Sequence, residues 1–193
     1  MITYHNMIKN KIYLSRHGQS LYNLENRLGG NPDLSDKGKL YAIKLKSFVE
    51  GTDIEYVYTS GLLRTINTAK YINLPKEKKS YLDELNAGIC EDLTYEDVKE
   101  KYPDEFEKRK LDKLNYRYPE GESYIDLVNR LKPIFEMIKN EDRVILIVAH
   151  QAILRVIYGI LTDKPKETFP FIEIPLHTIF CLENNQEKIN KLL

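Results

Sequence analysis

The chain has little of what several classes of protein require. Its two cysteines, Cys90 and Cys181, are too few for a disulfide framework and lack metal-ligand spacing, so we expect two buried free thiols. Lys plus Arg equals Asp plus Glu at 29 each, which gives no bulk attraction to nucleic acid or to an anionic membrane. No stretch approaches the roughly 18 apolar residues that cross a bilayer, and residues 1–10 lack the apolar core of a signal peptide. We therefore expect a cytoplasmic protein that binds neither nucleic acid nor membrane.

The sequence also lacks the patterns that divide a chain into separate parts. It has no internal repeat, no low-complexity linker and no boundary of a second domain. A length of 193 residues suits one three-layer α/β unit, so we expect a single domain over residues 1–193. No Gly-x-x-x-x-Gly-Lys-Ser/Thr loop occurs, which excludes a nucleotide site of the P-loop type.

What the sequence does contain is an imidazole and a guanidinium side by side after an apolar run. Arg16, His17 and Gly18 closely follow residues 12–14, which are typical of a buried strand. A neutral imidazole is a nucleophile, and the neighbouring Arg offers a planar fork of donors to phosphate oxygens. Glycine lets the backbone approach a ligand closely. This combination indicates attack on a phosphate.

The same layout, an apolar run followed by a polar residue, recurs twice. Residues 54–60 lead to Arg64 near the start of a helical stretch, and the apolar run 144–149 ends at His150. In open parallel sheets with helices on both faces, ligands bind outside the carboxyl ends of the strands. We therefore expect a three-layer α/β/α sandwich with a mainly parallel sheet. Its strand ends would form one anion-binding pocket from Arg16, His17, Arg64 and His150.

Helical periodicity separates these strands. Ser35 is placed to cap a helix over residues 36–50 that Gly51 ends, with an apolar side made of Leu40, Ile43, Leu45, Phe48 and Val49. Further helices are expected over residues 94–114, 122–140 and 151–161, with a kink or break at Pro133. Residues 178–182 are typical of a strand, and residues 184–193 give no clear signal.

With these residues in place, the chain resembles the histidine phosphatase superfamily, whose phosphoglycerate mutase-like members carry a strand ending in Arg-His-Gly. The more specific similarity is to the bisphosphatase domain of the bifunctional 6-phosphofructo-2-kinase/fructose-2,6-bisphosphatase enzymes. It extends from Lys11 to about Leu182 and includes Asn23, Gly29-Gly30, residues 82–95, 116–119, 121–124, 150–151 and 175–178. The resemblance implies a phosphoglycerate mutase-like fold and hydrolysis of the 2-phosphate of fructose 2,6-bisphosphate.

The resemblance also implies how that phosphate is transferred. The phosphoryl group would pass to His17, and water would then release it. Around its oxygens would stand Arg16, Arg64, His150 and Asn23. Glu84 occupies the position of the acid that protonates the leaving oxygen, with Asp83 and Glu91 as nearby alternatives. Because cationic side chains neutralise the phosphate, we expect neither a metal nor another cofactor.

The residues that bind the sugar bisphosphate follow from the same resemblance. The matching positions are Gly30 in the phosphate loop and, for the sugar and its distal 6-phosphate, Tyr95, Arg109, Lys113, Tyr124, Gln151 and Arg155. Arg and Lys supply charge to a second phosphate dianion, and tyrosine hydroxyls supply directional donors. His177, in contrast, is expected to have a structural role.

Two other functions would use the same residues. A phosphoglycerate mutase or broad-specificity sugar-phosphate phosphatase would keep the phosphohistidine chemistry, and a non-catalytic binding module would keep only the pocket. Gln19, Leu114 and Asn115 depart from the bisphosphatase pattern, which bears on the sugar contacts. Without a P-loop the chain does not carry the kinase half, although residues 1–10 resemble a connector and favour a kinase domain in a longer parent chain. The residues do not reveal the oligomeric state.

Overall fold

A sheet of six strands lies at the centre of the computed structural model, which describes residues 11–184 and 186–193. The strand order is β3-β2-β4-β1-β5-β6. The strands are β1 (Ile12–Arg16), β2 (Tyr56–Thr59), β3 (Lys76–Lys78), β4 (Ile145–Ala149), β5 (Thr178–Glu183) and β6 (Gln186–Lys191). Strands β1 to β4 run parallel, whereas β5 is antiparallel to β1 and β6 to β5. The sheet is therefore mixed, parallel at its centre and antiparallel at one edge. The expected connector at residues 1–10 lies outside the described residues.

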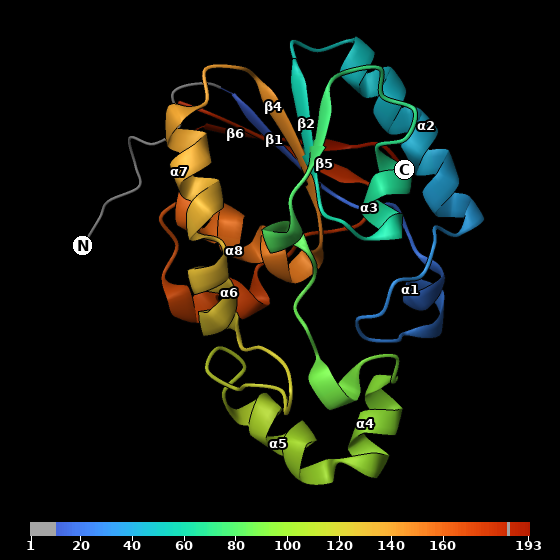
Figure 1. Ribbon diagram of the computed structural model, residues 1–193, viewed down its shortest axis with the longest axis vertical. Helices are drawn as coiled ribbons and strands as arrows, with labels where there is room; N and C mark the ends of the chain where they lie inside the picture. Colours follow the sequence, from blue (N-terminus) through green and yellow to red (C-terminus); the bar gives the residue numbers. More distant parts are fainter. Residues whose placement is uncertain (1–10, 185) are drawn as a thin grey trace.

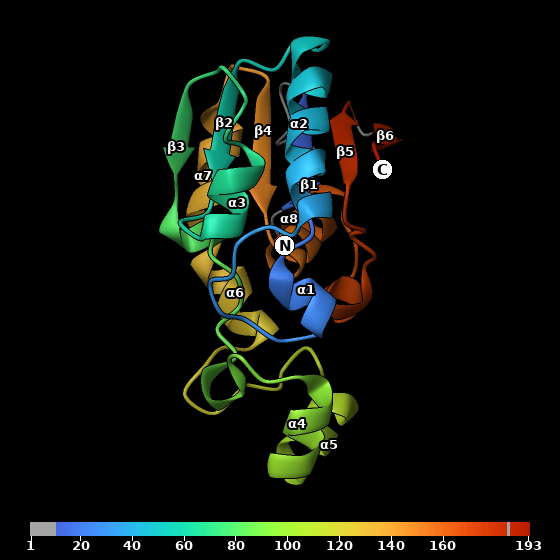
Figure 2. The ribbon, with the colours of Figure 1, turned by 90° about the vertical axis from the view of Figure 1, so that its right-hand side faces the viewer.

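Helices cover both faces of this sheet (Figures 1 and 2). On one face lie α2 (Asp36–Glu50) and α3 (Leu63–Thr68), and on the other α6 (Tyr124–Arg130), α7 (Lys132–Asn140) and α8 (Gln151–Leu161). Alternate strand residues serve the two layers, because successive side chains point to opposite faces. In β4, Ile145 and Ile147 pack with α6 to α8, whereas Leu146 and Val148 pack with α2. The expected three-layer α/β/α sandwich is confirmed.

A small lobe lies beyond the carboxyl ends of the strands (Figure 1). It consists of α4 (Tyr95–Lys101), α5 (Pro103–Leu111) and the loops that flank them. Its core is a separate cluster around Cys90, Val98 and Tyr118. The five-residue helix α1 (Leu21–Glu25) follows β1 after the loop of residues 17–20. Short 3-10 turns at Ser80–Leu82, Gly88–Cys90 and Lys166–Phe171 complete the chain.

Proline explains how two expected helices divide. The helix expected over residues 94–114 separates at Tyr102 into α4 and α5, because Pro103 has no N–H and begins a new helix. The expected break near Pro133 is confirmed, since α6 ends at Arg130 and Pro133 lies in the first turn of α7. Both cysteines are buried and free, as expected.

The apolar side expected for α2 is wrong in part. Leu40 and Ile43 are 46% and 50% exposed, whereas Tyr41, Leu45 and Val49 are buried against the sheet. The buried side of the helix differs from the expected one because Gly38 packs against the loop after β1 and the Tyr41 hydroxyl forms a hydrogen bond with that of Ser15 in β1. The expected cap is correct, with the Ser35 hydroxyl accepting from the Gly38 amide at 3.2 Å.

Candidate active site

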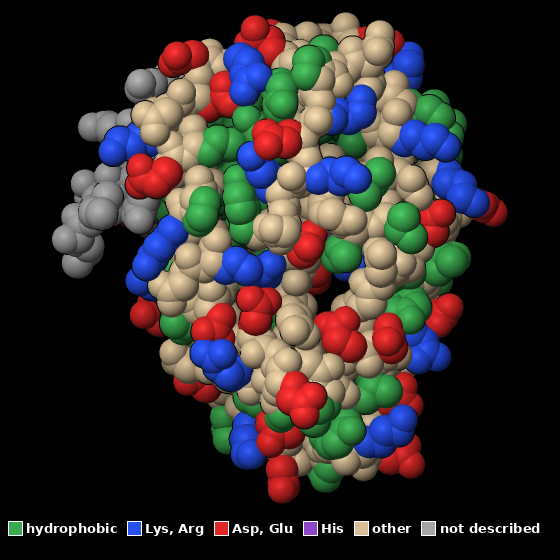
Figure 3. Space-filling model, in the orientation of Figure 1, with side chains coloured by type: hydrophobic (Ala, Val, Ile, Leu, Met, Phe, Trp, Pro, Cys, Tyr) green, Lys and Arg blue, Asp and Glu red, His purple; other side chains and the backbone are tan. Residues whose placement is uncertain are grey.

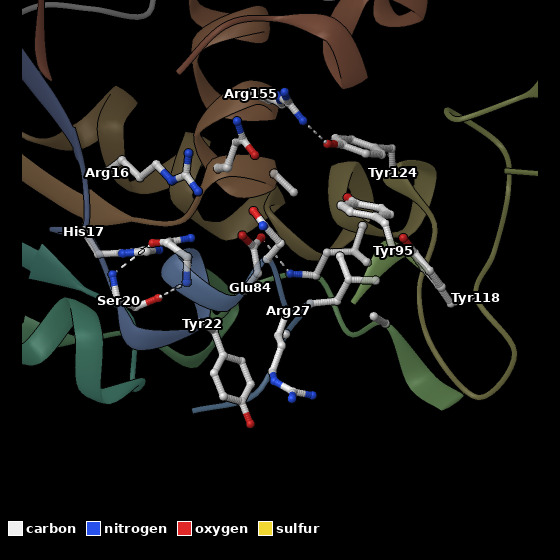
Figure 4. Close-up of a pocket in the computed structure, with 18 of the residues that line it drawn as sticks. Arg16, His17, Ser20, Tyr22, Arg27, Glu84, Tyr95, Tyr118, Tyr124 and Arg155 are labelled. Carbon is white, nitrogen blue, oxygen red and sulfur yellow. Dashed lines mark hydrogen bonds between the residues drawn. The ribbon is translucent and has the colours of Figure 1, made fainter. Parts of the chain in front are cut away.

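A cavity of about 310 Å³ lies between the carboxyl ends of the strands and the α4–α5 lobe. Figure 3 shows an opening at this place, and Figure 4 shows the side chains around it. The predicted residues that line it are Arg16, His17, Asn23, Arg64, Glu84, Tyr95, Arg109, Lys113, Tyr124, Gln151 and Arg155. The other two, His150 and Gly30, stand behind this lining, and both contact Arg64.

His17 is held in one tautomer by the loop that follows β1. Its Nδ1 donates to the Gly18 carbonyl at 2.7 Å, which leaves the Nε2 lone pair free to act as a nucleophile. The Gly18 amide in turn donates to Thr68 Oγ1 on α3 at 2.8 Å. Burial, and then the charges of Arg16 and Arg64, hold the pKa of His17 well below its usual value. The imidazole is therefore neutral, as a nucleophile must be, throughout the neutral pH range.

Close packing fixes the backbone of this loop. A Cβ at Gly18 would lie 2.6 Å from the Gly38 carbonyl oxygen, and one at Gly38 would lie 2.1 Å from that of Gln19. The backbone N–H of Gln19 donates to His177 Nε2 at 3.1 Å. The Ser35 hydroxyl donates to the side-chain oxygen Oε1 of Gln19 at 2.9 Å. The side chain of Gln19 therefore holds the loop to the start of α2, and His177 has the structural role expected of it.

Arg16, Arg64 and Asn23 line the cavity together with His17. Arg64 is buried, and its Nη1 donates to the Gly30 carbonyl at 2.8 Å. Burial lowers the pKa of Arg16 to about 10 despite the opposing charge of Glu84, so the guanidinium keeps its charge at pH 7. The buried Arg16 Nε has no partner within the described residues. The Asn23 Oδ1 closes a capping box with Ser20, which leaves the Asn23 amide group to donate to a ligand.

His150 holds Arg64 through a chain of hydrogen bonds that defines its own tautomer. Arg64 Nε donates to His150 Nδ1 at 3.2 Å, so the proton of the neutral ring sits on Nε2. That Nε2 donates to Ser60 Oγ at 2.7 Å. The Ser60 hydroxyl donates to Thr65 Oγ1 at 2.7 Å, because Thr65 already donates to the Leu62 carbonyl. The His150 ring faces that of His17 with centroids 5.2 Å apart. His150 thus helps to fix the Arg64 side chain in the lining of the cavity.

Glu84 is the carboxylate that faces the cavity. Its Oε1 accepts from the Leu85 amide at 2.9 Å. The two alternatives are engaged elsewhere. Asp83 accepts from the Gly61 amide at 2.7 Å, and Glu91 accepts from Gly30 and Ala87 amides at 2.5 and 2.6 Å. Of the three carboxylates that the sequence left open, the geometry favours Glu84 as the acid.

A second cationic cluster lies across the cavity from His17. Arg109 comes from α5, Lys113 follows α5, and Arg155 belongs to α8. Arg155 donates to the Tyr124 hydroxyl at 3.1 Å and to the Ile172 carbonyl at 2.7 Å. Burial and the charges of Arg155 and Arg109 lower the pKa of Lys113 to about 8. In Figure 4 the rings of Tyr95 and Tyr124 lie on this side, away from Arg16 and His17. The cavity therefore has cationic side chains both beside His17 and beside Tyr95 and Tyr124.

Several lining residues were not predicted. They are Ser20, Tyr22, Asn26, Arg27, Leu28, Gly29, Leu85, Ala87, Tyr116, Tyr118 and Ala152. Tyr118 is the most informative, because Arg109 lies 5.3 Å from the Tyr95 centroid and 5.8 Å from that of Tyr118. Tyr118 could have been found from the sequence, because residues 116–119 belong to the part of the chain that resembles the bisphosphatase domain.

Two features are absent from residues 11–184 and 186–193. No helix there is both long enough and apolar enough to traverse a bilayer. No group of three or more His, Cys, Asp or Glu side chains there is arranged to hold a metal ion.

Comparison with known families and sequences agrees with this geometry. The family model of the histidine phosphatase superfamily (branch 1) matches residues 12–192. A 6-phosphofructo-2-kinase/fructose-2,6-bisphosphatase of Arabidopsis thaliana is 45% identical over 191 residues, which cover 94% of this chain and 26% of that protein. The Gallus gallus protein of the same name is 44% identical over 173 residues, covering 89% of this chain and 37% of that protein. The chain thus spans between a quarter and two fifths of the length of these relatives.

Solved structures show the same fold at lower identity. The alpha-ribazole phosphatase of Shigella flexneri aligns with a TM-score of 0.84 and 20% identity, covering 95% of this chain and 96% of that chain. A Bacillus stearothermophilus protein, YhfR, aligns with a TM-score of 0.79 and 24% identity, covering 93% and 94%. These similarities establish the fold but not the substrate, which has to be inferred from the side chains of the cavity.

Proposed function

The chain belongs to the histidine phosphatase superfamily, and we propose that it hydrolyses the 2-phosphate of fructose 2,6-bisphosphate, giving fructose 6-phosphate and phosphate. One observation carries the proposal. A single cavity joins a neutral, buried His17 to a distant cationic cluster of Arg109, Lys113 and Arg155. A small sugar with phosphates at both ends has the chemistry that such a cavity binds. The similarity to enzymes named for this activity supports the same substrate.

In the first step, His17 Nε2 attacks the 2-phosphorus while the bond from phosphorus to the sugar oxygen breaks. Glu84 gives its proton to that oxygen, and fructose 6-phosphate leaves. The phosphoryl group remains on His17. Arg16 and Arg64 stabilise the negative charge on the equatorial oxygens, and the Asn23 amide adds a neutral donor. Since both guanidiniums stand in place before the reaction, little reorganisation accompanies the transfer.

In the second step, a water molecule attacks the phosphorus of phosphohistidine 17. The Glu84 carboxylate accepts a proton from that water, and the bond from Nε2 to phosphorus breaks. Inorganic phosphate is released, and His17 returns to its neutral state because the Gly18 carbonyl still holds the Nδ1 proton. Glu84 regains the proton that it gave in the first step. The residues are therefore restored after each turnover.

The first experiment is phosphate release from fructose 2,6-bisphosphate in excess chelator, with 3-phosphoglycerate, 2,3-bisphosphoglycerate and sugar monophosphates as a panel. We expect selective release from the bisphosphate. A preference for another panel member would retain the histidine chemistry and overturn the substrate. Ligand binding without turnover of any panel member would instead favour a binding module.

Two variants separate the two ends of the cavity. His17→Ala should abolish turnover of every substrate together with the acid-labile phosphoprotein, because the nucleophile is gone. Arg109→Ala should raise KM for the bisphosphate by roughly 10–100-fold, the loss expected for a charge-assisted hydrogen bond. Its effect on a small phosphate monoester should be far smaller. Equal losses on both substrates would contradict a distal phosphate subsite at Arg109.

A further inference from the structure

The loop that carries the acid is fastened to the loop before α6. We refer to residues 84–91 as the acid loop. Two backbone bonds join the loops: the Glu122 amide donates to the Asn86 carbonyl at 2.9 Å, and the Ile89 amide donates to the Pro119 carbonyl at 3.1 Å. A Cβ at Gly121 would lie 2.5 Å from the Asn86 carbonyl oxygen, so the two backbones are in close contact. The position of the acid loop therefore depends on the start of α6.

The side chains of Glu122 and Arg130 extend this attachment to Glu84 itself. Glu122 Oε2 accepts from the backbone N–H of Asn86 at 3.0 Å and from Arg130 Nη2 at 3.1 Å. The same Arg130 Nη2 also lies 3.4 Å from the Glu84 carbonyl oxygen, to which it donates. The Arg130 Nε lies 3.0 Å from Glu122 Oε1. Arg130, the last residue of α6, thus bridges its own helix and the backbone of the acid.

The orientation of the Glu84 carboxyl follows from this backbone. Oε1 accepts from the adjacent Leu85 amide at 2.9 Å, so the carboxyl group is tied to the peptide that Arg130 holds. With Oε1 occupied as an acceptor, Oε2 is the oxygen left to carry the transferable proton. A rotation of the peptide between Glu84 and Leu85 would move both oxygens away from the leaving group.

We propose that Arg130 and Glu122 are positioning residues for the acid Glu84. They hold the peptide that orients its carboxyl group, and they do not themselves touch the substrate. The inference rests on the proposed function to the extent that Glu84 acts as the acid. A role in stability alone is the competing explanation. Because both side chains are partly exposed, at 24% and 22%, their ion pair by itself contributes little to stability.

Leaving-group dependence distinguishes the two explanations. Glycerol phosphate and sugar phosphates need a proton on the departing alkoxide, whereas p-nitrophenolate departs without one. We expect Arg130→Met, which keeps the apolar stem, to lower kcat on alkyl phosphates by about tenfold or more, because general acid catalysis typically contributes 10²–10⁴-fold. Its effect on p-nitrophenyl phosphate should stay within about twofold. Arg130→Lys, which keeps the charge, should restore part of the alkyl activity.

The double variant with Glu84→Gln is the decisive measurement. If Arg130 acts through Glu84, adding Arg130→Met to Glu84→Gln should cause no further loss on alkyl phosphates. Additive losses, or equal losses on aryl and alkyl phosphates, would overturn the proposal. A wild-type protein that hydrolyses only aryl phosphates would also overturn it, because no acid would then be at work.

A matched control exists near the same helix. Arg117 forms an exposed ion pair with Asp126 on α6, with 2.5 Å between Nη2 and Oδ1. Arg117→Met removes an arginine–carboxylate pair of the same kind and should leave both activities unchanged. Alkyl phosphates other than the bisphosphate allow this test even if the wild-type protein does not accept fructose 2,6-bisphosphate. The failure of the proposed substrate and that of the positioning role are therefore distinguishable.

Discussion

Lys113 makes the distal end of the cavity sensitive to pH. Burial and two neighbouring arginines lower its pKa to about 8, so the ammonium is protonated at pH 7 and largely neutral at pH 9. A bound phosphate dianion favours the charged form, so binding above pH 8 must take up a proton. We therefore expect KM for fructose 2,6-bisphosphate to rise above pH 8, approaching tenfold per pH unit.

Two comparisons test this pH dependence by steady-state kinetics. A monophosphate without a distal phosphate should show no such rise in KM. Lys113→Met should raise KM at pH 7 and remove the further rise above pH 8. If that variant kept the same pH dependence, another group would have to be responsible.

Sequence patterns could place the side chains of the cavity together, but they could not predict how each side chain is oriented. The ends of β1, β2 and β4 bring Arg16, His17, Arg64 and His150 together, because a parallel sheet aligns its carboxyl ends. His150 was expected in the same pocket, but its tautomer and its hydrogen bond to Ser60 could not be predicted, since a tautomer depends on partners that are distant in sequence. The position of Tyr118 beside Arg109 depends on how the lobe folds over the cavity.

At the scale of elements, α2 packs closely against the loop after β1 that carries His17. Glycine inside a helix ordinarily costs about 1 kcal/mol relative to alanine, so replacing Gly38 should stabilise α2 in isolation. Here the new Cβ would lie 2.1 Å from the Gln19 carbonyl oxygen. We expect Gly38→Ala to lower the free energy of unfolding by roughly 1–3 kcal/mol, the usual cost of overpacking, and to lower kcat by displacing the loop of His17.

Gly51, at the other end of the same helix, provides the control. Its φ is −95°, and a Cβ there would come no nearer than 3.6 Å to the Phe48 carbonyl oxygen. Gly51→Ala should change the free energy of unfolding by less than about 0.5 kcal/mol. Urea unfolding of both variants measures the difference. Equal stability of the two variants would mean that the loop after β1 moves to accept the new Cβ without loss of stability.

The two edge strands of the sheet, β3 and β6, are among the elements that the sequence did not predict. β6 has six residues paired with β5, but five of them are exposed and none is buried, so no apolar face marks it. β3 consists of three exposed charged residues. Both strands form by completing backbone hydrogen bonds of a neighbour, which leaves no periodic signal. The buried strands β1 and β4, in contrast, were evident from their apolar runs.

For the molecule as a whole, three buried histidines couple stability to acid. His17, His150 and His177 are 3%, 0% and 4% exposed. Burial is the largest cause of a lowered pKa for all three, and that of His177 falls to about 4. Below pH 6.5, the ordinary pKa of histidine, these side chains therefore bind protons in the unfolded chain but much less in the folded one. The free energy of unfolding should fall as pH falls below 6.5, by up to about 1.4 kcal/mol per pH unit for each histidine.

His177 allows this coupling to be tested without touching the cavity. It accepts from the Gln19 amide, and a glutamine side-chain oxygen at this position could accept the same bond. We expect His177→Gln to be less stable at pH 7 but to lose stability less steeply between pH 6.5 and 5, where unfolded carboxyl groups are still ionised. Urea unfolding at pH 7, 6 and 5 measures both quantities. If the free energy of unfolding of the variant fell with pH as steeply as that of the wild type, His177 would have to bind protons equally in the folded and unfolded states. Its burial and the nearby charges of Lys37 and Arg16 predict the opposite.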